Sequence, residues 1–147
     1  MADDCTEGFV TDAMLGKLTT YMRMAGLDAV YAPDEGAVDD EEVAELVDAT
    51  RRTLVTRDVE LAERTDGVLV RSKEVGEQVR ELRQTGVTFE LDEPRRCSDC
   101  NGGLSETDTE ADDVPDDVER AWRCDDCGKT YWKGSHWDDL RRRLEEL

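Results

Sequence analysis

Apolar and polar positions follow two different rhythms along the first two thirds of the chain. Short apolar runs predict five strands, at residues 9–10, 27–31, 53–56, 67–70 and 87–91. Between the strands, apolar residues recur three or four positions apart and predict helices of about ten residues. The first helix carries such a stripe, formed by Met14, Leu15, Leu18, Met22 and Ala25. Strands joined by helices favour an α/β fold in which a parallel sheet lies between two layers of helices.

This alternation of strands and helices stops near Pro94, where the cysteine-containing part of the chain begins. We therefore expect an α/β domain at residues 8–94 and a smaller unit at residues 95–147, which ends in a helix. A length of 147 residues suits one compact domain with such an appendage.

Acidic residues follow three successive predicted strands. Asp12 follows the first strand, Asp39 and Asp40 begin the helix after the second, and Asp58 follows the third. These side chains can converge, because the carboxyl ends of parallel strands lie at one edge of a sheet. Carboxylates about 4 Å apart repel by about 1 kcal/mol in water and about 4 kcal/mol at a dielectric of 20. A bound Mg²⁺ or Mn²⁺ reverses that repulsion and suits phosphodiester hydrolysis, so the pattern predicts a catalytic metal site.

Residues for other common chemistries are missing from this domain. The first 135 residues contain no histidine, which excludes imidazole acid–base catalysis there. The first strand is not followed by a Gly-rich phosphate-binding loop. The alternative is that the acids only cap helices, because aspartate is a preferred cap residue and 38 of the 147 residues are acidic.

Two CxxC pairs in the smaller unit predict a zinc site. Their cysteines are Cys97, Cys100, Cys124 and Cys127. Four thiolates complete a tetrahedral shell and leave no open position, so the zinc is expected to be structural. A thioredoxin-type dithiol would need one pair at a helix start in a βαβ unit, which the pattern does not favour. The fifth cysteine, Cys5, has no partner nearby in the sequence and is expected to be a spare thiol.

Aromatic and cationic residues alternate just after the second CxxC pair. Such a segment can stack bases and neutralise phosphates, and within it Lys133 and His136 are candidate RNA contacts. The alternative is that Tyr131, Trp132 and Trp137 form the small core that joins the ribbon to the domain.

The net charge of −19 indicates a strongly solvated acidic surface. Self-repulsion of this size destabilises a compact state at low salt and is largely screened at about 1 M salt, so we expect a halophilic protein. The charge also argues against strong sequence-independent binding to nucleic acid, which depends on phosphate neutralisation. No apolar run approaches the length of about 18 residues expected of a membrane helix, and a cytoplasmic location is expected.

Taken in order, these motifs resemble the Mut-7 C-terminal RNase-domain family. The resemblance rests on DAMLGKL at residues 12–18, DDEE at 39–42, LVTRD at 54–58, LVRS at 69–72, the two CxxC pairs, and YWKGSHW at 131–137. It covers residues 9–144 and implies a PIN-like three-layer nuclease fold with a fused zinc ribbon.

The resemblance also implies an Mg²⁺- or Mn²⁺-dependent ribonuclease. Its acidic site maps onto Asp12, Asp58 and Asp40, with Asp39 or Glu41 as alternatives to Asp40. PIN nucleases often have a fourth acid after the fourth strand, but here that region is the run RSKE at residues 71–74.

We therefore expect an RNA endonuclease in which a metal-bound water attacks a phosphodiester. Lys17, Arg57 and Arg71 are expected near the same sheet edge, where they could stabilise phosphate charge. The competing hypothesis is a non-catalytic RNA- or ribosome-binding protein in which the acids only cap helices and keep the protein soluble.

Overall fold

The computed structural model describes residues 8–89, 91, 93–109 and 114–146 of the chain. Cys5 lies outside these residues. The first part of the chain is built on a parallel sheet of four strands: β1 (Phe9–Thr11), β2 (Ala29–Tyr31), β3 (Thr53–Thr56) and β4 (Val68–Leu69). The strand order is β2-β1-β3-β4, and Val10 is aligned with both Val30 and Leu54. The predicted α/β fold with a parallel sheet is confirmed.

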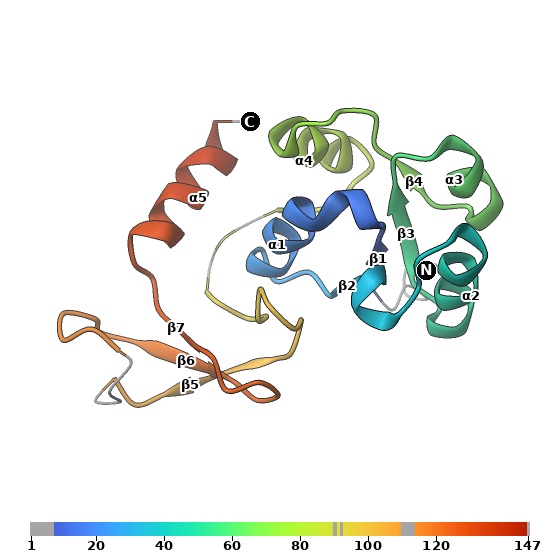
Figure 1. Cartoon of the computed structure of the whole chain (residues 1–147). Helices are drawn as coiled ribbons and strands as arrows, with labels where there is room; N and C mark the ends of the chain where they lie inside the picture. The colour runs from blue at the N-terminus through green and yellow to red at the C-terminus, as the bar shows by residue number, and fades with distance from the viewer. Residues whose placement is uncertain (1–7, 90, 92, 110–113, 147) are drawn as a thin grey trace.

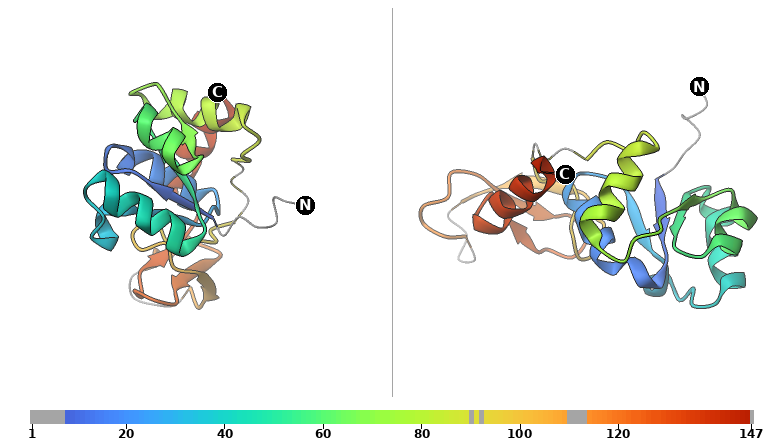
Figure 2. Two further views of the ribbon diagram at one scale, coloured as in Figure 1. Left: turned by 90° about the vertical axis from the view of Figure 1, so that its right-hand side faces the viewer. Right: turned by 90° about the horizontal axis from the view of Figure 1, so that it is seen from above.

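Helices cover both faces of this sheet, as Figures 1 and 2 show. α1 (Gly16–Met24) and α4 (Val75–Gln84) lie on one face, while α2 (Asp40–Thr50) and α3 (Val59–Thr65) lie on the other. Each face has its own buried apolar cluster, the first centred on Leu18, Met22 and Leu82, and the second on Val43, Leu54 and Leu61. Short 3-10 turns at Ala13–Leu15 and Ala32–Glu35 follow β1 and β2.

The predicted fifth strand is wrong. The described residues of that segment, 87–89 and 91, have no regular secondary structure, and they pair with no strand of the sheet in the part of the chain that the structure describes. The apolar side chains are nevertheless used: Phe89 is buried, and Val87 and Leu91 pack against the cluster beneath α1 and α4. Their apolar pattern therefore reflects burial under helices and not strand pairing, a distinction that a short apolar run cannot make.

The second part of the chain forms a small antiparallel sheet of β5 (Leu104–Thr107), β6 (Ala121–Cys124) and β7 (Thr130–Tyr131), in the order β5-β6-β7. Helix α5 (Ser135–Glu145) follows it and returns to the first part, where Leu140 and Leu144 join the cluster beneath α1 and α4. Arg83 donates to the carbonyl of Leu144, which fixes α5 beside α4. None of the helices in the described ranges is long and apolar enough to cross a membrane.

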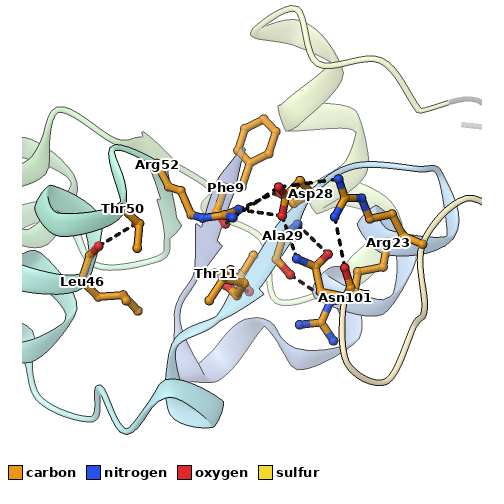
Figure 3. Close-up of polar contacts among 11 residues, drawn as sticks. Phe9, Thr11, Arg23, Asp28, Ala29, Leu46, Thr50, Arg52 and Asn101 are labelled. Carbon is orange, nitrogen blue, oxygen red and sulfur yellow. Dashed lines mark hydrogen bonds and ion pairs between the residues drawn. The ribbon is translucent and has the colours of Figure 1, made fainter. Parts of the chain in front are cut away.

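The small sheet is fastened to the amino-terminal ends of the central strands, as Figure 3 shows. Asp28, which precedes β2, receives two hydrogen bonds from Arg52 (2.7 and 3.2 Å), which precedes β3. Asn101 also donates to Asp28 (2.7 Å) and accepts from the amide of Ala29 (3.0 Å). Arg23, from α1, donates hydrogen bonds to the carbonyls of Ala29 and Ser98. The carboxyl ends of the strands, where the acidic site was predicted, lie at the opposite edge.

Candidate active site and zinc site

Two of the predicted acids, Asp12 and Asp58, are linked at the carboxyl edge by a third residue, Thr56. The hydroxyl of Thr56 donates to Asp12 Oδ2 (2.8 Å) and accepts from the backbone amide of Asp58 (3.1 Å). Thr56 is fully buried, so its hydroxyl holds both acidic residues from within the sheet. In the strand order β2-β1-β3-β4, the chain runs outward from β1 to β2 in one direction and from β3 to β4 in the other. The two acidic residues therefore lie at the topological switch point between β1 and β3, where α/β folds bind ligands.

Both acids also cap the element that follows them. Asp12 Oδ1 accepts from the amide of Ala13 (2.7 Å), and Asp58 Oδ1 accepts from the amide of Leu61 (3.2 Å). A carboxylate offers about four lone-pair positions on its two oxygens, so one cap bond does not exhaust either side chain. Capping and cation binding are therefore compatible at both positions.

The three neighbouring candidates for the second acid are used differently. Asp39 caps α2 by accepting from the amide of Glu42 (2.8 Å), and Glu41 pairs with Arg64 of α3 (2.6 Å). Asp40 is exposed in the first turn of α2, and within the described ranges its carboxylate makes no hydrogen bond or ion pair. Of these three acids, Asp40 therefore has the carboxylate that is most available to a ligand.

Cationic side chains lie at the same edge. The Arg57 guanidinium donates to the carbonyl of Arg71 (3.3 Å), and its Nε is shielded from solvent without a hydrogen-bond partner. Lys17 is exposed in the first turn of α1 and lines a cavity of about 570 Å³, to which Lys73, Arg143, Glu74 and Glu146 also contribute.

Sequence reasoning missed two residues that shape this edge. One is Thr56, whose only signal was a polar residue at the end of an apolar strand. The other is Glu81 of α4, whose two oxygens accept from the amides of Arg71 and Ser72 (2.7 and 3.1 Å). The Glu81 carboxylate thus holds the loop after β4.

The four predicted zinc ligands form one compact cluster. Their sulfur atoms all lie within 4.8 Å of one another, with Cys97 and Cys127 3.6 Å apart and Cys100 and Cys124 3.4 Å apart. Tetrahedral zinc with Zn–S distances near 2.3 Å separates sulfurs by about 3.8 Å, so the cluster fits a zinc ion. No other group of three or more potential ligands is this tight among the residues that the structure describes, and the three carboxylates are not gathered to the same degree.

The thiols differ in acidity because their surroundings differ. Burial alone would raise the pKa of Cys97, but the Tyr131 hydroxyl (2.9 Å from Sγ) and nearby backbone amides lower that pKa to about 7. The pKa of Cys100 rises to about 12, through desolvation and the neighbouring thiols. Four crowded thiols cannot all ionise at neutral pH by themselves, and a bound dication favours the thiolate forms.

The predicted RNA contacts after the second CxxC pair lie away from the acids. Lys133 is on the ribbon, where its ammonium lies 5.7 Å from the ring centre of Trp137. His136 is in the first turn of α5, and its side chain lies outside the described part of the chain. The structure therefore places Asp12, Asp58 and Arg57 at one edge of the sheet and joins the ribbon to the other.

In a comparison with protein-family models, the chain matches the Mut7-C RNAse domain over residues 7–144. Neither the curated proteins nor the solved structures compared with the chain gave a match. Because the matched region covers nearly the whole sequence, this chain belongs to the Mut7-C RNAse domain family.

Proposed function

We propose that this member of the Mut7-C RNAse domain family is a metal-dependent endoribonuclease whose site is the carboxyl edge of the β1–β3 pair. The supporting observation is that Thr56 links the carboxylate of Asp12 to the backbone amide of Asp58, which places both acidic residues at the switch point of the sheet. In this proposal residues 8–94 form the nuclease domain and residues 95–147 form the zinc ribbon with its helix.

Asp12, Asp40 and Asp58 would hold Mg²⁺ or Mn²⁺, since hard divalent cations prefer oxygen ligands. Such a cation, when bound, lowers the pKa of a water ligand and stabilises charge on a phosphoryl oxygen. Thr56 orients the Asp12 carboxylate and the backbone of Asp58, and the amide of Leu61 orients the Asp58 carboxylate. Arg57 and Arg71 would contact the non-bridging phosphate oxygens. Lys17, at the start of α1, would neutralise a neighbouring phosphate of the RNA.

The zinc site supports the nuclease domain and takes no part in cleavage. Its four thiol ligands leave no position for a substrate, and the ribbon is bonded to the amino edge of the sheet through Asn101 and Ser98. Free thiols grouped as a metal site suit a reducing compartment, so a cytoplasmic location belongs to the proposal.

A second candidate function is a non-catalytic RNA- or ribosome-binding protein. The observation that favours it is that Asp12, Asp39 and Asp58 each cap a helix, a use that needs no metal. The two candidates differ in whether the carboxylates are needed for RNA cleavage.

Cleavage of a labelled single-stranded RNA with Mn²⁺ and with Mg²⁺ separates them. Wild-type protein is expected to cut the RNA internally, and Asp12→Asn and Asp58→Asn are each expected to lower the rate at least 100-fold. Asp48→Asn, at an exposed position of α2, removes the same charge far from the β1–β3 edge and should leave the rate unchanged. Equal products from wild type and Asp12→Asn would show that cleavage does not arise at this site.

A further inference from the structure

A cavity of about 510 Å³ lies between the ribbon, the end of α1 and the start of α5. It is within the range of small-molecule sites, about 300–1,000 Å³. Its wall includes three aromatic residues, Tyr131, Trp132 and Trp137, and two cations, Arg96 and Lys129, together with Met24 at the end of α1. No described lining residue is acidic, although 38 of the 147 residues of the chain are Asp or Glu. The cavity is thus set apart from the rest of an acidic protein by its charge.

Of the three tryptophans, Trp122 is a core residue, whereas Trp132 and Trp137 line the cavity. Trp137 is only 5% exposed, so the half-buried Trp132 offers the more accessible ring. An added Cβ at Gly134 would come within 2.9 Å of Trp132 Nε1, so the glycine leaves room for this indole beside the backbone. An aromatic face in a cationic cavity is the arrangement that stacks a nucleobase.

The cations of the cavity are held near their places by weak, partly exposed contacts. Lys129 contacts Asp99 (2.9 Å) and lies 5.4 Å from the ring centre of Tyr131. Arg96 lies 3.7 Å from Asp28 and donates to the carbonyl of Asn101 (3.1 Å). Exposed ion pairs contribute only about 0.2–1 kcal/mol, so a phosphate can compete for both cations at little cost.

A second cavity that Trp132 also lines, about 580 Å³ in volume, serves as an internal comparison. Its two cations, Arg120 and Lys133, are offset by two acids, Asp117 and Glu119, so its wall has no net positive charge. The first cavity has two cations and no acid, and it is therefore the better site for an anion that carries an aromatic base.

We propose that this cavity binds an unpaired nucleotide of single-stranded RNA, with its base stacked on Trp132 and its phosphate against Arg96 and Lys129. The proposal rests on the proposed function, for which the cavity would act as a second contact site for the substrate. Met24, the last residue of α1, lines the cavity, whereas α1 begins beside the acidic edge. A nine-residue helix is about 14 Å long, so the bound RNA would extend over this distance along α1, from the ribbon toward the acidic site.

Binding can be measured separately from cleavage with zinc-loaded Asp12→Asn protein and no added Mg²⁺ or Mn²⁺, by fluorescence anisotropy of a labelled single-stranded RNA. Trp132→Ala is expected to weaken binding about 5- to 150-fold, the effect of losing one stacked base at about 1–3 kcal/mol. Trp132→Phe keeps an aromatic face and should retain most of the affinity. Gln84→Ala, at an exposed residue of α4 that lines neither cavity and lies away from the acidic edge, is the control and should bind like its parent.

Salt dependence and RNA structure provide two further readouts. Each neutralised phosphate contributes about −0.7 to the slope of log K against log salt for a single strand, so Lys129→Ala should reduce the magnitude of the slope by up to about 0.7. A duplex of the same sequence should bind more weakly and be insensitive to Trp132→Ala. Equal binding by Trp132→Ala and its parent, with zinc content and far-UV spectrum unchanged, would overturn the proposal, as would a Trp132-dependent preference for duplex. Loss of cleavage alone bears only on the acidic site, because the binding assay uses a variant expected to be inactive.

Discussion

One carboxylate, that of Asp28, accepts polar contacts that join the amino edge of the parallel sheet to the cysteine-containing part of the chain. It accepts two hydrogen bonds from Arg52 and one from Asn101, with Arg96 nearby. Asp28→Asn preserves the shape of the side chain but removes its charge. The new oxygen could still accept from Asn101 and from Arg52 Nη1 at the Oδ1 position, but the new NH₂ group would then face Arg52 Nη2 and Arg96, which are also donors.

The expected loss follows from these contacts. A hydrogen bond to a charged group contributes about 1.5–3 kcal/mol, and several are weakened together. The Asp28 side chain is 28% exposed, which allows water to replace part of the loss, so we expect a destabilisation of about 2 kcal/mol.

The effect should depend on pH in a defined direction. Desolvation alone would raise the pKa of Asp28, but hydrogen bonds from Arg52 and Asn101 and the charge of Arg96 hold that pKa below its ordinary value of 3.8. A lowered folded-state pKa means that the stabilisation is complete above the unfolded value and is lost as the pH falls through the folded value. The difference between wild type and Asp28→Asn should therefore be constant from neutral pH to about pH 5 and shrink below about pH 4.

Urea unfolding with zinc in excess, followed by far-UV circular dichroism, measures this difference. Asp48→Asn carries the same change in net charge at an exposed site and is expected to alter the free energy of unfolding by less than about 0.5 kcal/mol. If Asp28→Asn and Asp48→Asn unfold at the same urea concentration at neutral pH, the network around Asp28 does not hold the ribbon to the sheet.

Four further outcomes are expected. Cys100→Ser should lower the bound zinc from about one ion per chain and destabilise the ribbon, whereas Cys5→Ser should retain the full zinc content; equal zinc in both would refute the four-cysteine site. Asn101→Ala should destabilise more than Asn101→Gly by about 1 kcal/mol, because residue 101 has a φ of 69° that alanine adopts poorly; the reverse order in urea unfolding would contradict this. Gly67→Ala should lower the free energy of unfolding in urea by about 1–3 kcal/mol, because an added Cβ would lie 2.7 Å from the carbonyl oxygen of Leu54. Gly16→Ala is the control, since the nearest atom to its added Cβ is 3.4 Å away. Equal effects of the two substitutions would exclude the steric explanation. The melting temperature should rise between about 0.1 M and about 3 M KCl, because salt screens the −19 net charge; an unchanged value would count against a halophilic protein.

The sequence predicts the parallel sheet and the zinc ligands because both depend on local signals. Strand ends followed by acids, and cysteines spaced as CxxC, fix the carboxyl edge and the zinc cluster without knowledge of distant contacts. The fifth strand could not be recognised as wrong in advance, since Phe89 is buried in the structure as it would be in a strand.

The parts of the site that escaped prediction depend on contacts between residues far apart in the chain. Thr56 bridges to Asp12 across 44 positions, and Asn101 joins Ala29 across 72 positions. No pattern within a single segment of the sequence indicates either pairing. The same is true of the ribbon cavity: the aromatic segment is visible in the sequence, but the separation of a half-buried Trp132 from the buried Trp122 and Trp137 appears only once the chain is folded.

The most direct test of the proposed acidic site is a titration of zinc-loaded protein with Mn²⁺, followed by the electron paramagnetic resonance signal of free Mn²⁺ at fixed ionic strength. A protein of net charge −19 binds Mn²⁺ weakly at many places, so the comparison is between Asp12→Asn and Asp48→Asn, which have equal charge. The account predicts that wild type and Asp48→Asn share a tight site that Asp12→Asn lacks. Identical titration curves for all three proteins would contradict it.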